Sequence, residues 1–282
     1  MNSANTCRLA TRKSPLAMRQ TEIVAGLVHD LLGMDVEIIP MVTTGDQRMD
    51  WSLQEQGGKG LFTKELEQAI LDGRADIAVH SAKDMPTKDP EGLEISAFLK
   101  REDPRDVLVT RENTTSIQKL ASGSPRRISQ LKNRFPRVEW LELRGNVETR
   151  LKKIAENEEA DGTILASAGL NRLKIGQFPG LHFERLEVDK MVPAPGQAAI
   201  AVQTKASESE KFSVLGDRAT EKSVRFERKI LKCMGGGCQV AMGVHLCNDT
   251  LYFFHEKIGL VTREFLTQPE DVLIQELLGS IQ

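Results

Sequence analysis

The chain has 282 residues, of which 40% are hydrophobic and 28% are charged, a composition typical of folded globular proteins rather than disordered ones. Lys and Arg number 38 and Asp and Glu number 40, so the net charge of −2 excludes a strongly basic surface for nucleic acid or an anionic membrane. With no apolar run near the ~20 residues of a membrane span and no signal-peptide pattern at the start, we expect a cytoplasmic protein of two or three domains.

The N-terminal part of the chain predicts strands that alternate with helices. Strands are expected over residues 7–11, 36–42 and 77–79. One helix begins at Ser14-Pro15, because serine is a favoured N-cap and proline is tolerated in the first turn. A second helix is capped by Thr63, runs to about Leu71 and is ended by Gly73. This alternation favours a parallel α/β sheet.

The stretch 106–192 repeats the same pattern. A second Ser-Pro pair, at 124–125, again opens a helix with one apolar face. The sequence ADGTILASAG (160–169) echoes ADIAVHSAKD (75–84), each with an Ala-Asp start, an apolar run and a Ser-Ala exit. We therefore predict two doubly wound α/β domains that are built on one plan.

The chain changes character from about residue 216. A charged helix, a glycine-rich loop, short strands and a last helix near 270–278 predict a small α+β domain. Crossings between the first two domains are expected at the proline-containing segments 101–105 and 192–196. The expected domains are residues 1–101 with 194–214, residues 102–193, and residues 215–282.

The four cysteines do not form a metal or disulfide pattern. None of them has CxxC spacing with a nearby histidine, so neither a zinc site nor a disulfide framework is expected. Cys7 in the first strand and Cys233 on the charged helix are expected to be small core residues. Cys238 follows three glycines and is expected on an exposed loop, where an incidental thiol and a covalently reacting one both remain open.

Cations are concentrated where α/β sheets bind ligands, at strand ends and helix starts. They are Arg12, Lys59, Lys83, Arg126, Arg127, Arg144 and Arg150, the last on a helix that Asn146 is expected to cap. Each one alone could be a solvated surface charge. However, arginines in a first helical turn oppose the helix dipole, so the pair at 126–127 is unfavourable unless an anion is bound. Together they predict a cleft for a substrate with several carboxylates or phosphates.

Asp84 is the one acid among these cations. It follows the strand at 77–79, where the second domain has a glycine. A functional carboxylate and an Asx-turn before Met85-Pro86 are both compatible with that position. The nearby His80 is interpreted as a satisfied buried histidine rather than as a base.

Taken together, these motifs resemble the porphobilinogen deaminase (hydroxymethylbilane synthase) family. The matching blocks run in order along nearly the whole chain: RLATRKSPLA, GGKGLFTKELE, RADIAVHSAKDMPT, REDPRD, the Arg126-Arg127 pair, LRGNVETRL, AGLNRL and GGGCQVAMG. The resemblance implies two periplasmic-binding-protein-like domains plus a small α+β domain that carries a dipyrromethane cofactor, joined to Cys238 through a thioether. It implies that four porphobilinogen units lose ammonia and couple head to tail, before hydrolysis releases hydroxymethylbilane.

The resemblance also implies roles for individual residues. Asp84 would be the catalytic carboxylate. The expected cofactor-binding residues are Ser81, Lys83, Ser124, Arg126, Arg127 and Cys238. The expected substrate-binding residues are Arg12, Ser14, Lys59, Arg144, Arg150 and Arg172. No metal is implied, and a monomer is expected. Binding through Arg127 predicts that its exchange for leucine weakens substrate use or cofactor loading and leaves stability nearly unchanged.

Two segments depart from the family pattern. Residues 121–125 read ASGSP where the family usually has GTSSx before its arginine pair, and residues 196–198 read GQA instead of GQG. The extra Cβ of Ala198 stands where backbone is expected to approach closely. Two alternatives to the enzyme therefore stay open: a slow paralogue that loads the cofactor, and a non-catalytic anion-binding protein.

Overall fold

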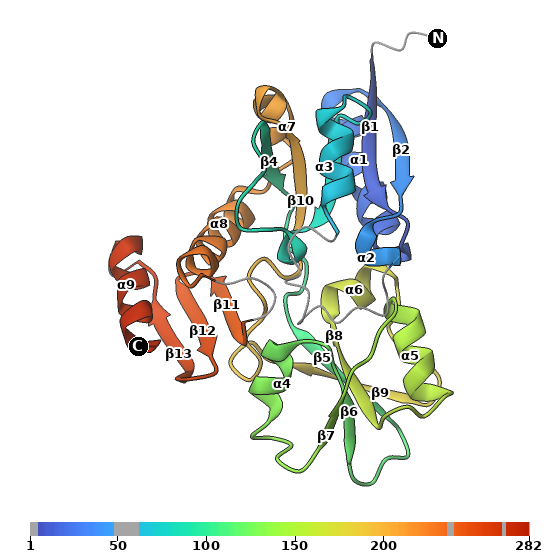
Figure 1. Ribbon diagram of the computed structural model, residues 1–282, viewed down its shortest axis with the longest axis vertical. Coiled ribbons are helices and arrows are strands. Elements are labelled where there is room, and N and C mark those ends of the chain that lie inside the picture. Colours follow the sequence, from blue (N-terminus) through green and yellow to red (C-terminus); the bar gives the residue numbers. More distant parts are fainter. Residues whose placement is uncertain (1–4, 48–61, 236–239, 267–268, 282) are drawn as a thin grey trace.

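The computed structural model describes residues 5–47, 62–235, 240–266 and 269–281. Within that part of the chain, two five-stranded sheets lie one above the other and a three-stranded sheet flanks them (Figure 1). No helix of the described part is long and apolar enough to cross a membrane. The α/β class with a small α+β addition is as expected from the sequence.

The first sheet has helices on both faces. Its strands are β1 (Thr6–Arg12), β2 (Asp35–Met41), β3 (Ile77–Ser81), β4 (Leu93–Phe98) and β10 (Ile200–Lys205), in the order β2-β1-β3-β10-β4. Leu9 packs with α1 (Pro15–Leu32), whereas the next residue, Ala10, packs with α3 (Lys64–Leu71). Because successive strand residues point to opposite faces, these two helices cover opposite sides of the sheet.

Local signals account for the ends of these helices. Ser14 caps α1 by accepting a hydrogen bond from the backbone N of Ala17 at 3.3 Å, and Gly33 ends it in the left-handed region. Thr63 stands at the expected N-cap position of α3, but its hydroxyl is buried and makes no capping bond in the described residues. Gly73 adopts a φ of 70° just beyond α3, which confirms the predicted end.

The second sheet repeats the plan of the first. Its strands are β5 (Asp106–Arg111), β6 (Lys119–Ala121), β7 (Glu139–Leu141), β8 (Gly162–Ala166) and β9 (Leu181–Leu186), in the order β7-β6-β8-β5-β9. In both sheets the first three strands are parallel and the last two are antiparallel to their neighbours. The aspartates of the two Ala-Asp pairs also make equivalent hydrogen bonds to the backbone. Asp76 accepts from the backbone N of Arg8 at 2.8 Å, and Asp161 accepts from that of Lys119 at 2.9 Å. The predicted internal repeat is confirmed.

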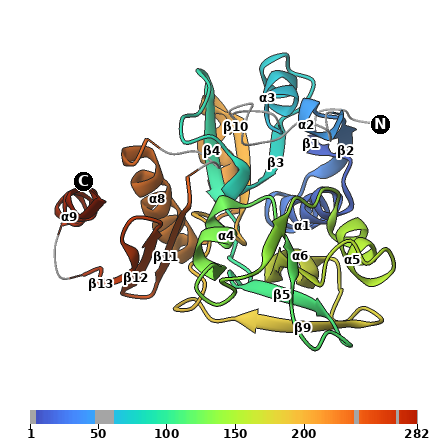
Figure 2. The ribbon, with the colours of Figure 1, turned by 60° about the horizontal axis from the view of Figure 1, so that its bottom comes forward.

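Helices again cover both faces of this sheet. α5 (Val147–Ala155) and α6 (Ser167–Arg172) adjoin one core, and α4 (Pro125–Leu131) adjoins the other (Figure 2). Asn146 caps α5, as predicted, by accepting from the backbone N of Thr149 at 2.9 Å. The chain runs from β4 in the first sheet to β5 in the second, and returns from β9 to β10.

The third unit packs a helix pair against a small antiparallel sheet. After two short helical segments, η3 (Ala206–Glu208) and α7 (Ser209–Ser213), come α8 (Arg218–Cys233), β11 (Met242–Cys247), β12 (Thr250–His255), β13 (Gly259–Glu264) and α9 (Glu270–Ile281). Phe226 and Ile230 of α8 join the core beneath the sheet. Cys7 is buried as expected, but Cys233 is exposed, so its assignment to the core was wrong. It lies in the last turn of α8, where its side chain is exposed.

Candidate functional site

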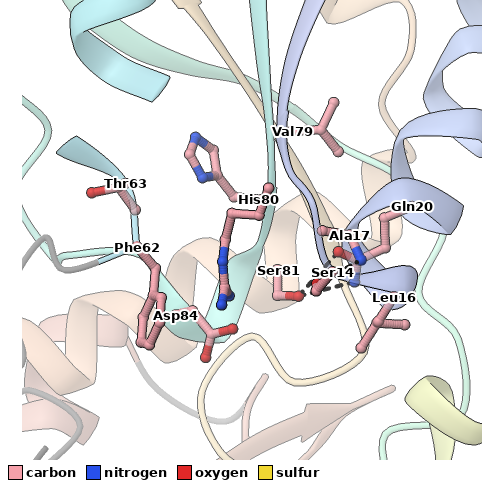
Figure 3. Close-up of a pocket in the computed structure, with 11 residues that line it drawn as sticks. Ser14, Leu16, Ala17, Gln20, Phe62, Thr63, Val79, His80, Ser81 and Asp84 are labelled. Atoms are coloured by element: carbon pink, nitrogen blue, oxygen red, sulfur yellow. Dashed lines mark hydrogen bonds between the residues drawn. The ribbon is translucent and has the colours of Figure 1, made fainter. Parts of the chain in front are cut away.

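A small pocket lies at the carboxyl ends of β1 and β3. It encloses about 80 Å³ and is lined by Arg12, Ser14, Leu16, Ala17, Gln20, Phe62, Thr63, Val79, His80, Ser81 and Asp84 (Figure 3). Both strands end at this edge because they run parallel, and the start of α1 lies there as well. This is the position at which open α/β sheets bind ligands.

Asp84 ends a short 3₁₀ turn, η2 (Ala82–Asp84), directly after β3. Its side chain is exposed and lies at the pocket beside Phe62 (Figure 3). Within the described residues its carboxylate makes no hydrogen bond or ion pair, so nothing there supports the Asx-turn interpretation. A carboxylate left without an internal partner is available to a bound cation.

Arg12 reaches the pocket, but it is already paired. Its Nε donates to Oδ2 of Asp46 at 3.2 Å, and its guanidinium lies 4.1 Å from the centre of the Phe62 ring. Burial favours protonation of Asp46, yet Arg12 and Thr43 outweigh it and lower the pKa of that carboxyl. The arginine is therefore fixed in place, with part of its charge balanced inside the protein.

The serines and the histidine of the pocket have structural partners. The Ser81 hydroxyl accepts from Nε2 of Gln20 at 2.9 Å, and Ser14 caps α1. His80 lies 3.1 Å from Oε1 of Gln203, and burial lowers its pKa to about 4. His80 is consequently neutral at pH 7, which agrees with its interpretation as a satisfied buried residue.

A buried cluster of charges lies next to this pocket. Arg126 donates to Oδ2 of Asp106 at 2.7 Å, and Arg127 donates to Oδ1 at 2.7 and 3.1 Å. Nε2 of Gln197 lies 3.1 Å from the same Oδ1, and its Oε1 accepts from Lys83 at 3.3 Å. The anion that an arginine pair in a first turn requires is thus Asp106, a residue of the chain itself.

The electrostatics of the cluster follow from its burial. Burial favours protonation of Asp106, but Arg126 and Arg127 outweigh it and hold the pKa well below its usual range. Burial lowers the pKa of Lys83 to about 8, and Arg127 acts in the same direction, against Asp84 and Asp106. The side chain of Lys83 therefore gains or loses its proton close to physiological pH.

Asp106 and Gln197 were not predicted from the sequence as site residues. Asp106 is an acid at the first residue of an apolar strand, DVLV, and it is fully buried there. Since such a charge needs a buried partner, that placement was the signal that could have found it. Gln197 offered no comparable signal, because it lies more than 90 residues after Asp106 in the sequence and meets it only in the folded chain.

The remaining predicted cations differ in their surroundings. Burial lowers the pKa of Arg150 to about 10, with Arg127 and Arg144 acting in the same direction and Asp84 against them, so Arg150 belongs to the group around the pocket. Arg144 lies beside it and is paired with Glu142 at 2.5 Å. Arg172 is not part of this group, because burial and Glu102, rather than Asp84, determine its pKa of about 10.

Three further predictions concern residues near the cluster or outside the described chain. Ser124 caps α4, where its hydroxyl lies 3.5 Å from the backbone N of Arg127. Lys59 and Cys238 lie outside the described residues.

Ala198 adopts a φ of 74°, in the left-handed region, and its carbonyl accepts from Arg172 at 2.5 Å. Its departure from glycine therefore falls on a backbone position that favours glycine.

A second buried ion pair, which the sequence did not predict, joins both crossings to α8. Glu227 is fully buried and accepts from Arg101 of the first crossing at 2.6 and 3.0 Å. It also accepts from the backbone N of Gly196 in the return crossing at 2.7 Å and from that of Leu246 at 2.9 Å. Despite burial, Arg101 and His245 lower the pKa of Glu227 to about 2. One carboxylate thus ties the third unit to the segments between the two large sheets.

Comparison with known proteins gives one consistent result. The family model described as porphobilinogen deaminase, dipyromethane cofactor binding domain, matches residues 7–213. The porphobilinogen deaminase of Syntrophotalea carbinolica is 41% identical over 252 residues, which cover 86% of this chain and 79% of that protein. The porphobilinogen deaminase of Methylobacillus flagellatus is 39% identical over 279 residues, which cover 95% and 89%. The chain belongs to the porphobilinogen deaminase family.

Proposed function

We propose that this chain is a porphobilinogen deaminase, a transferase that releases ammonia from porphobilinogen and joins four units into hydroxymethylbilane. The observation that carries the proposal is the carboxylate of Asp84, which has no hydrogen-bond partner among the described residues and lies beside a buried excess of positive charge. The family model and the named relatives support the same activity.

The charged residues fit a dipyrromethane and the pyrrole chain that extends it. Among the described residues, Lys83, Arg126 and Arg127 face the buried carboxylate of Asp106, and Lys83 also lies near the exposed carboxylate of Asp84, so positive charge is in excess. Uncompensated buried charge is costly unless a bound anion balances it. Each pyrrole unit carries an acetate and a propionate, and arginine binds such carboxylates through paired hydrogen bonds. Attached to Cys238, the dipyrromethane would supply the pyrrole carbon at which the chain grows.

Asp84 is suited to stabilise the substrate as ammonia leaves. Loss of ammonia from the aminomethyl group leaves positive charge on the pyrrole, and a carboxylate at the pocket stabilises that charge. The same carboxylate can hold the proton that moves between the pyrrole and the leaving amine. Arg12 would bind a carboxylate of the substrate at the pocket, and Ser81 would bind one of the cofactor; both side chains are fixed by internal partners.

Exchange of Asp84 for asparagine tests the catalytic assignment. The substitution keeps the shape of the side chain but removes its charge and its proton acceptor, so turnover should fall by about 10²–10⁴-fold. The measurement uses protein with preassembled cofactor, since the same chemistry would build the cofactor. Asp72→Asn, at an exposed aspartate after α3, is the matched control and should retain full turnover. An Asp84→Asn enzyme within a few-fold of the parent contradicts the assignment.

The intact mass of the purified protein tests the cofactor assignment. A dipyrrole-sized increment that is absent from Cys238→Ser and present in Cys233→Ser would support Cys238 as the attachment point. Recovery of a pyrrole-bearing peptide containing Cys233 or Cys247 contradicts it. A non-catalytic anion-binding protein predicts neither an increment nor ammonia release, so the same two measurements separate that alternative from the enzyme.

The proposal also covers the oligomeric state of the protein and its cellular compartment. The site is assigned to residues of this one chain, and the protein is proposed to act as a monomer. The described cysteines, Cys7, Cys233 and Cys247, are free thiols, which accords with a reducing compartment such as the cytoplasm. Sedimentation of the holoenzyme tests the first point: a dimer that loses activity on dilution into monomers would contradict it.

A further inference from the structure

Within the part of the chain that the structure describes, the direction of the Asp84 carboxylate is set by its backbone. None of the described side chains or backbone groups bonds to it, so its direction depends on how firmly the segment 82–86 is fixed. That segment is the 3₁₀ turn Ala82–Asp84 followed by Met85 and Pro86. Whatever fixes this segment also sets where the carboxylate enters the pocket.

Arg228 of α8 reaches the segment on both sides of Asp84. Its Nη2 donates to the carbonyl oxygen of Pro86 at 2.6 Å, and its Nη1 lies 3.4 Å from the carbonyl oxygens of Ala82 and Met85. Its guanidinium is largely enclosed, and burial lowers its pKa. One planar, charged group therefore spans three carbonyl groups of a five-residue segment.

Other contacts close the segment from the same helix and from the opposite side. Val224, one turn before Arg228, packs in one core with Ala82 and Met85. On the other side, the backbone N of Ala82 donates to the carbonyl of Ala199 at 3.0 Å. The segment thus lies between α8 and the return crossing, and Arg228 supplies the polar bonds from α8.

We propose that Arg228 is a positioning residue for Asp84, which fixes the direction of the carboxylate by binding carbonyl groups on both sides of it. The inference rests on the proposed catalytic role of Asp84. It also gives α8 two tasks, since this helix ends only five residues before Cys238 in the sequence. The helix that precedes Cys238 in the sequence would thereby also fix the direction of the proposed catalytic acid.

A double-mutant cycle with cofactor-loaded protein tests this role. Arg228→Met keeps the apolar stem but removes every donor, so kcat should fall by about 10–100-fold, the effect of a displacement near 1 Å, while KM changes little. In an Asp84→Asn background the same substitution should lower kcat by less than about threefold, because the group that it positions is gone. Arg225→Met is the matched control. It lies on the same helix, half-exposed and bonded to Glu221 and to Ile95 O, and should leave kcat unchanged.

The outcomes separate this inference from the proposed function. An unchanged kcat in Arg228→Met, or equal losses in both backgrounds, overturns the positioning role and leaves Asp84 as the catalyst. A parent-like kcat in Asp84→Asn overturns both. If Arg228→Met does not retain the cofactor, Arg228→Lys enters the same cycle. Lysine can reach only part of the three carbonyls, so a loss of about three- to tenfold is expected in the parent and none in Asp84→Asn.

Discussion

Exchange of Arg127 for leucine tests whether this arginine serves only to bind a ligand or also stabilises the folded protein. Read from the sequence alone, Arg127 opposes its helix dipole, so its loss leaves stability nearly unchanged. In the structure its guanidinium donates twice to Asp106 and once to the carbonyl of Ile164, at 2.8 Å. The structure therefore predicts that Arg127→Leu destabilises the protein as well as weakening binding.

The expected loss of stability depends on the partners that Asp106 retains in Arg127→Leu. Removal of one partner from a buried ion pair costs about 3–5 kcal/mol. Because Asp106 retains Arg126 and Gln197, we expect the lower end, about 3 kcal/mol. With an unfolding entropy of about 2.1 cal/mol/K per residue over 282 residues, this lowers Tm by about 5 °C.

Thermal unfolding of matched variants provides the assay. Arg134→Leu is the control, because Arg134 also makes two hydrogen bonds to one carboxylate, that of Glu184, at 2.9 and 2.7 Å. Its side chain is 45% exposed, against 9% for Arg127, so its loss should cost less than about 1 kcal/mol. If both variants melt within 1 °C of the parent, the buried pair does not stabilise the fold and the reasoning fails.

Three further predictions concern backbone strain and pH. Ala198→Gly relieves a left-handed alanine and should raise Tm by about 2 °C, for about 1 kcal/mol, whereas Ala199→Gly should lower it; a fall in both refutes the strain. The pKa of Glu227 drops from 4.5 unfolded to about 2 folded, so it adds about 3 kcal/mol above pH 4.5, which is lost as pH falls toward 2. The Tm difference between parent and Glu227→Gln should shrink over that range, and a constant difference contradicts the assignment. Lys83 loses its charge as pH rises through about 8, so KM should rise there in the parent and not in Lys83→Arg; equal rises would exclude Lys83 from anion binding.

Much of the fold was predictable because its signals are local. The caps at Ser14 and Asn146 act on amides three residues away, and Gly73 is read from its own backbone requirement. The echo between 75–84 and 160–169 reflects two copies of one supersecondary pattern. Exposure of Cys233 was not predictable in this way, because it depends on how the end of α8 is covered in the folded chain.

The site was only partly predictable, for a different reason. Position after a strand was enough to single out Asp84 and Lys83. The partners that set their properties, Asp106 and Gln197, approach from other segments, and α8 reaches the same turn from more than 140 residues away. A pattern of residue types along the chain does not specify which distant carboxylate meets which arginine.

The α/β class, the internal repeat, the family and the acid at the end of β3 could all be predicted from the amino-acid order, because each rests on spacing within one element or on a motif. The pairing of Asp106 with both arginines, and of Glu227 with both crossings and α8, depends on how distant segments pack. Arg101 and Glu227 are 126 residues apart, and their bond forms only when the first crossing and α8 meet in the folded chain. Such contacts strongly affect stability, because a charge buried away from water is costly unless a partner of opposite charge is buried beside it.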